Sequence, residues 1–210
     1  MDEKQSLETL SDIKRIMERS SRFLSLSGWS GVAAGICGLA GAAWGQQVLL
    51  RYQGSLSAGG QGLDGLLLQT QLIRQLFLVA GLTFFCALVS VIVFTWLHTR
   101  RRHLPVWNAG SRRLLVNLFI PLIAGGIFLL GMLYRHEYHF IGAGCLVFYG
   151  LALVNAGKYT LTDIRYLGLL EILLGLVCLF FESYTLYFCA FGFGLLHIVY
   201  GLIMWKKYKG

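Results

Sequence analysis

Glu171 and His197 are ionisable residues inside long apolar runs, each lying between two glycines that are seven positions apart. If both runs are membrane-spanning helices, Glu171 and His197 lie roughly 10–12 Å from the same membrane surface. Antiparallel neighbouring helices would then bring the carboxylate and the imidazole to one level. Because a lone buried charge is costly, the two groups are expected to pair or to face water. Such a pair can hold and pass on a proton.

Four further polar side chains are expected in the same half of the membrane: Asn117, Asn155, Tyr149 and Tyr200. With Glu171 and His197 they predict a ligand- or proton-binding site in a cavity open to the cytoplasm, since intramembrane ionisable groups commonly serve function. The alternative is an interhelical hydrogen bond that fixes helix register. Such bonds contribute about 0.6 kcal/mol on average. The sequence leaves both interpretations open.

Other residue types that carry chemistry give weaker signals. His136, Glu137 and His139 form an HExH, which lacks the HExxH spacing of a catalytic zinc helix, so a polar turn is the simpler interpretation. The five cysteines lie in apolar runs without a CxxC pair, as buried thiols do. No Walker A loop, GxSxG elbow, Rossmann fingerprint or haem-binding CxxCH occurs. The sequence therefore predicts no catalytic residue, metal or cofactor.

The elements that must position these residues are apolar. The chain has 210 residues, 56% of them hydrophobic and 13% charged, whereas soluble domains carry about 25% charge. Helices are expected because a backbone in lipid must satisfy its own hydrogen bonds. The sequence predicts an all-α, six-helix transmembrane bundle with spans at about 28–50, 72–97, 114–134, 140–156, 166–181 and 186–205.

Basic residues divide unequally between the two sides that this topology creates. Of the 18 Lys and Arg residues, only Arg51, Arg74 and Arg135 fall on one side. The crowded side is expected in the cytoplasm, together with both chain termini. The net charge of +8 is explained by this asymmetry, so no nucleic-acid partner is predicted.

Three segments lie outside the predicted spans. Residues 1–27 are interpreted as a cytoplasmic amphipathic helix, which would either lie on the inner leaflet or dock a protein partner. Residues 53–65 are rich in glycine and serine and are predicted to form a flexible external loop. Residues 206–210 form a basic cytoplasmic tail.

Small residues recur at heptad spacing and predict close helix packing. They favour packing within the bundle, although a homodimer seam remains the alternative, because small residues let membrane helices approach closely. The predicted packing residues are Gly28, Gly31, Gly35, Gly38 and Gly45 in the first span, and Gly168, Gly175, Gly194 and Gly201 in the last two.

Three stretches resemble an uncharacterised bacterial family of multi-pass inner-membrane proteins. They are Ile13–Gly28, Tyr149–Tyr159 and Asp163–Glu171. The resemblance implies six spans and the bacterial inner membrane. No activity is assigned to the family, so the resemblance implies no catalytic residue.

The sequence favours a non-enzymatic sensory or scaffold protein with a polar intramembrane pocket and basic cytoplasmic docking segments. One alternative is a small proton-linked transporter or channel, and another is a membrane-embedded enzyme that acts on a lipid-soluble substrate. The predicted partners are the lipid bilayer, a cytoplasmic protein and a second copy of the chain.

Overall fold

A computed structural model describes residues 27–57, 63–101, 107 and 109–208. The amphipathic helix predicted at residues 1–27 lies outside these ranges except for its last residue. The long helices are α2 (Gly28–Ser57), α3 (Leu63–Arg101), α4 (Ala109–Tyr134), α5 (Ile141–Ala156) and α6 (Thr162–Cys178). The last helical rod consists of α7 (Thr185–Cys189), a π-helical segment (Ala190–Leu196) and α8 (His197–Lys207). The described residues contain no strand, so the predicted all-helical bundle is confirmed.

Five helical stretches are long and apolar enough to cross a membrane. They are Gly28–Ser57, Gly65–Arg100, Ala109–Tyr134, Tyr138–Tyr159 and Glu182–Lys207. The second stretch lies within α3. The fourth consists of α5 and the two 3₁₀ turns that extend it at its ends, Tyr138–Phe140 and Gly157–Tyr159. Helix α6 has 17 residues, about 26 Å at 1.5 Å per residue. The chain is therefore a multi-pass helical membrane protein.

The predicted external loop at residues 53–65 is wrong at both ends. Helix α2 continues to Ser57 and α3 begins at Leu63, and residues 58–62 lie outside the described ranges. The Ser55 and Ser57 hydroxyls donate to backbone oxygens of the preceding turn, at 3.0 and 2.9 Å. Because the helix itself satisfies these hydroxyls, a polar composition does not break it here.

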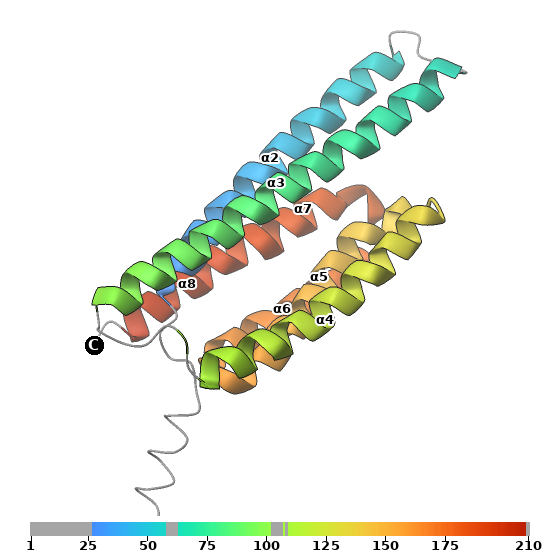
Figure 1. Cartoon of the computed structure of the whole chain (residues 1–210). Helices are drawn as coiled ribbons and strands as arrows, with labels where there is room; N and C mark the ends of the chain where they lie inside the picture. The colour runs from blue at the N-terminus through green and yellow to red at the C-terminus, as the bar shows by residue number, and fades with distance from the viewer. Residues whose placement is uncertain (1–26, 58–62, 102–106, 108, 209–210) are drawn as a thin grey trace, which may run out of the picture.

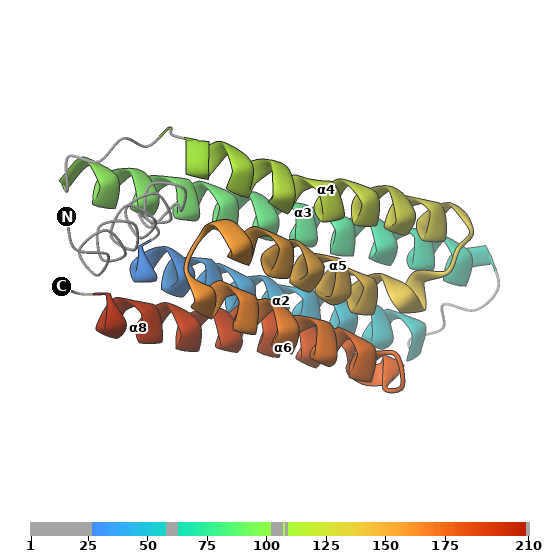
Figure 2. The ribbon, with the colours of Figure 1, turned by 90° about the horizontal axis from the view of Figure 1, so that it is seen from below.

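The long helices and the last rod run antiparallel to the one before them in the chain, and they form two groups (Figure 1). Helix α2 packs against α3 and against the last rod, while α5 packs against α4 and α6. Contacts of α5 and α6 with the last rod join the groups. Helices α3 and α4 lie on one side of the bundle and α6 and α8 on the other (Figure 2).

Glycines let the helix backbones meet. A Cβ at Gly35 would lie 2.6 Å from the Gly194 carbonyl oxygen, and one at Gly201 would lie 2.6 Å from the Val32 amide. Helices α5 and α6 approach in the same way, since a Cβ at Gly150 would lie 2.6 Å from the Gly168 oxygen. The α2 seam faces the last rod of the same chain along Gly28, Gly31, Gly35, Gly38 and Gly45, and Gly175 faces α5.

The bundle is apolar outside and holds polar groups inside. Phe84, Phe85 and Ile127 are more than half exposed, whereas Glu171 and His197 are buried. This arrangement reverses that of a water-soluble protein and fits a lipid environment.

Candidate functional site

Helix α6 and the last rod place Glu171 and His197 in contact. Glu171 is 0% exposed and His197 is 7% exposed. The His197 Nδ1 atom lies 3.5 Å from Glu171 Oε1, which is ion-pair distance when the imidazole is protonated. The two residues face each other because α6 and α8 run antiparallel, with Asp163 at the start of α6 bonded to Lys207 at the end of α8.

Both ring nitrogens of His197 have partners. Nδ1 lies 3.0 Å from the Gly192 carbonyl oxygen, and Nε2 lies 2.7 Å from the Tyr149 hydroxyl. A carbonyl only accepts, so Nδ1 carries a proton. In the neutral ring Nε2 then accepts from Tyr149, and in the imidazolium Nε2 donates to it. The backbone of one helix and a tyrosine from α5 thus fix the orientation of the imidazole.

The Glu171 carboxyl group lies in apolar surroundings. Neither oxygen has a hydrogen-bond partner within the described part of the chain. A Cβ at Gly192 would lie 2.5 Å from Glu171 Oε2 and 2.7 Å from Leu146 Cδ2, with Leu174 also close. Burying an ionised carboxylate without hydrogen bonds is costly. The group can avoid this cost by holding a proton or by sharing charge with His197.

The π-helical segment Ala190–Leu196 forms the other wall of the cluster. It includes Gly192, whose carbonyl accepts from His197, and Phe193, whose ring centroid lies 5.3 Å from that of Tyr149. Short π-helical turns occur frequently at functional sites. The segment ends where His197 begins α8, so the histidine lies at the change of helical pitch.

Three of the six predicted site residues come together, and three lie apart. Asn155 Nδ2 donates to the Asn117 backbone oxygen at 2.9 Å, and Asn117 Nδ2 donates to the Arg113 oxygen at 2.8 Å. The first bond links α5 to α4 and the second lies within α4, and neither involves Glu171 or His197. Tyr200 packs against the apolar cluster that contains Leu161 and Met204.

Other candidate chemistry lies at the opposite end of the bundle. His136 Nδ1 lies 2.6 Å from the Tyr138 hydroxyl, and His139 Nδ1 lies 3.5 Å from Glu182 Oε2 in an exposed pair. The described residues contain no group of three or more His, Cys, Asp or Glu that could hold a metal ion. All five cysteines are free.

Sequence reasoning missed Gly192, Phe193 and Leu146. The only signal for the first two was the glycine pair in Ala190-Phe-Gly-Phe-Gly194, shortly before His197. Such a pair is equally common in plain helix packing. A π-helical turn depends on how neighbouring helices pack, so local composition does not indicate it.

Fold and site together define an all-α, multi-pass membrane protein with a Tyr149–His197–Glu171 cluster, in which the histidine and the glutamate are buried and the tyrosine is partly buried. Comparison of the chain with protein-family models, curated proteins and solved structures gives no match.

Proposed function

We propose that the chain is a non-enzymatic sensory protein of the bacterial inner membrane, in which the Tyr149–His197–Glu171 cluster is the switch. Proton occupancy of the cluster would set the packing of the last helical rod against α2 and α6. The observation that carries this proposal is the Glu171 carboxyl group. It is 0% exposed, has no hydrogen bond among the described residues, and lies 3.5 Å from His197.

A purely structural role explains this carboxyl group poorly. An interhelical hydrogen bond that fixes register would use the carboxyl oxygens, yet both lack one within the described ranges. A leucine or glutamine at this position would avoid the cost of burying a charge. A carboxyl group changes its charge when it binds or releases a single proton. This property is useful in a switch, but it contributes nothing to helix packing.

Sensing agrees with the surroundings better than transport or catalysis does. A transporter needs water at the cluster from each side in turn, whereas Leu146, Leu174 and Gly192 close around Glu171. An enzyme needs room for a substrate and a nucleophile beside the pair. The packing favours a proton as the ligand because a proton needs no cavity.

The proposed orientation places the first residue of α2 and the last of α8 on the cytoplasmic side. Basic residues gather at this end, including Arg100, Arg112, Arg113, Arg165 and Lys207, and the positive-inside rule favours the cytoplasm for them. Six crossings and basic segments that dock a cytoplasmic protein are part of the proposal.

Infrared spectroscopy of the purified protein in nanodiscs tests the switch. Between about pH 5 and about pH 8, we expect a protonated-carboxyl band to change in the wild type and to be absent in Glu171→Gln. Glu182→Gln, at an exposed carboxylate, is the matched control and should keep the band. A band that does not change with pH in the wild type would refute the proposal.

Tryptophan fluorescence reports whether the proton moves the last rod. The Trp29 and Trp205 rings meet edge to face, with centroids 5.6 Å apart, and join the start of α2 to the end of α8. We expect a pH-dependent change in emission that Glu171→Gln and Trp205→Phe both remove. Proton flux into proteoliposomes that collapses in Glu171→Gln would instead identify a transporter.

A further inference from the structure

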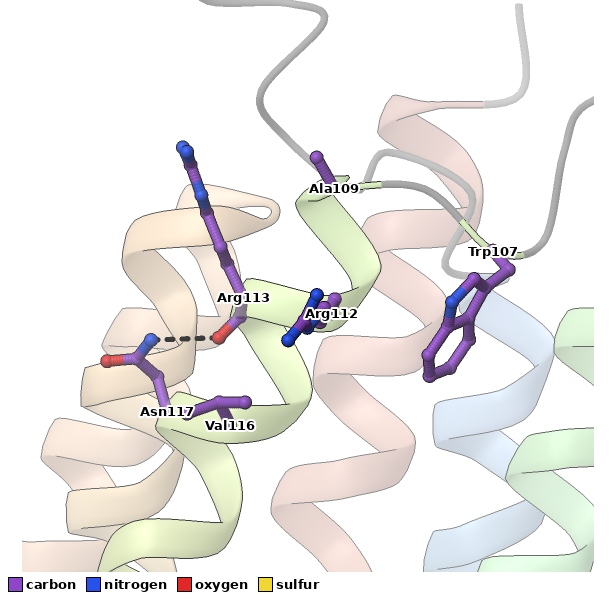
Figure 3. A pocket seen from close by; sticks show the side chains of 6 residues that line it. All are labelled: Trp107, Ala109, Arg112, Arg113, Val116 and Asn117. Atoms are coloured by element: carbon purple, nitrogen blue, oxygen red, sulfur yellow. Dashed lines mark hydrogen bonds between the residues drawn. The ribbon is translucent and has the colours of Figure 1, made fainter.

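A hollow at the start of α4 lies apart from the buried cluster. Trp107, Ala109, Arg112, Arg113, Val116 and Asn117 line it, and its volume is about 550 Å³ (Figure 3). The chain direction of α4 places it at the basic end of the bundle.

Two cations border this hollow. Arg112 and Arg113 are exposed, and the ion pairs of the described residues involve other bases. The Asn117 side-chain nitrogen donates to the Arg113 backbone oxygen, which fixes the amide beside the hollow (Figure 3). Arginine forks match the oxygens of a phosphate group, which they bind in a bidentate way.

An apolar stripe continues from the hollow along α4. Val116, Ile120, Ile123 and Ile127 are 52%, 59%, 58% and 67% exposed. Their spacing of four, three and four places them on one helix face, and Arg112, one turn before Val116, extends the same face. Trp107, 70% exposed, adds an aromatic ring at the edge, where tryptophan anchors to the membrane interface. The cationic surface and the apolar stripe therefore lie next to each other, in the same order as the headgroup and the acyl chains of a lipid.

We propose that this surface binds an anionic phospholipid. Its headgroup phosphate would lie between Arg112 and Arg113, and its acyl chains along Val116, Ile120, Ile123 and Ile127. Charge complementarity selects an anionic headgroup over a zwitterionic one, since basic pockets beside membrane helices bind such lipids. The stripe selects a lipid over free phosphate, because free phosphate gains nothing from apolar contact.

Lipid retention tests the proposal on the full chain. The protein is delipidated in neutral detergent and exposed to an equimolar mixture of phosphatidylglycerol and phosphatidylcholine, and the lipid retained after washing is quantified by mass spectrometry. We expect phosphatidylglycerol to be enriched by at least about fivefold on the wild type. The enrichment should fall to none in Arg112→Gln/Arg113→Gln.

Two further variants distinguish the contribution of the arginines from that of the apolar stripe. Arg74→Gln/Arg135→Gln removes the same charge at the opposite end and should keep the enrichment. Val116→Asn/Ile120→Asn should lower total lipid retention while both arginines remain. Circular dichroism checks that each variant is folded.

Three outcomes would overturn the proposal. Equal retention of the two lipids would exclude headgroup selection, and enrichment that survives Arg112→Gln/Arg113→Gln would exclude this surface. Binding of inorganic phosphate without retention of either lipid would identify a phosphate site with no lipid component.

Discussion

At the scale of single residues, the cluster depends on a missing side chain as much as on the polar ones. Gly192 leaves room for Glu171 Oε2, while its carbonyl accepts from His197 Nδ1. One residue thus contacts both members of the pair. A side chain added there must displace the Glu171 carboxyl group and the Leu146 and Leu174 methyl groups.

Gly192→Ala is therefore expected to destabilise the protein by about 1–3 kcal/mol, as overpacking does, because its Cβ would meet Glu171 Oε2 and Leu146. The measurement is the free energy of unfolding in mixed detergent micelles. Gly126→Ala on α4 is the control, since nothing lies within 4 Å of a Cβ there. A helix gains about 0.5–1 kcal/mol from alanine in place of glycine, so the control should be neutral or stabilising. Equal effects of the two changes would contradict this account.

Tyr149→Phe tests the other side of the imidazole. It removes the hydroxyl that lies 2.7 Å from His197 Nε2 and keeps the ring. We expect a loss of about 0.6 kcal/mol, and at most about 1.7 kcal/mol, the range of interhelical hydrogen bonds in membranes. The same unfolding measurement on Tyr184→Phe, at a residue 58% exposed, should give no loss. A neutral Tyr149→Phe would mean that this bond is not formed in the membrane.

The meeting of Glu171 and His197 at one level of the bundle could be predicted from sequence, because it follows from counting residues along rigid antiparallel helices. Asn117 could not be assigned in this way. An asparagine in a helix can bond a carbonyl of its own preceding turn, and Asn117 does so with Arg113. Whether such a side chain reaches a neighbour is decided by rotamer and packing. Tyr149 was one candidate among several, and only the packing of α5 distinguishes it from Tyr200.

At the scale of elements, the glycine seam of α2 is used within the chain. It lies against the π-helical segment and α8 from Gly28 to Gly38, and reaches Leu186 at Gly45. A homodimer would therefore need another face, such as those of α3 or α4. The helix ends were predicted less well than this seam, because the serine-rich turns near Ser57 satisfy their hydroxyls locally.

Gly35→Val tests the seam directly. A Cβ there would lie 2.6 Å from the Gly194 oxygen and 2.9 Å from the Ile198 amide nitrogen, and neither backbone atom can move without shifting the rod. We expect a loss of at least about 1–3 kcal/mol in the free energy of unfolding. Gly81→Val on α3 is the matched control, because nothing lies within 4 Å of its Cβ. If Gly35→Val unfolds like the control, α2 and the last rod do not pack this closely.

At the scale of the whole molecule, α6 decides how many times the chain crosses the membrane. It runs antiparallel to α5, and a Cβ at Gly175 would lie 2.9 Å from the Ala143 oxygen. Its 17 residues are at the short end of the range of about 17–25 for a spanning helix. The carboxyl group of Glu171 lies inside the bundle, so a spanning α6 would not expose it to lipid.

Reporter fusions after Tyr159 and after Glu182 measure this crossing. With six spans, a fluorescent-protein fusion after Tyr159 should be bright, because that position faces the cytoplasm. A periplasmic alkaline phosphatase fusion after Glu182 should be active, because α6 has carried the chain across. A third fusion after Tyr208 should again be bright, since the last rod returns. Absence of phosphatase activity at Glu182, with the Tyr159 fusion still bright, would mean that α6 does not span, and the basic end of α8 would then face the opposite side from the start of α2. Phosphatase activity at Tyr159 would instead contradict the proposed orientation.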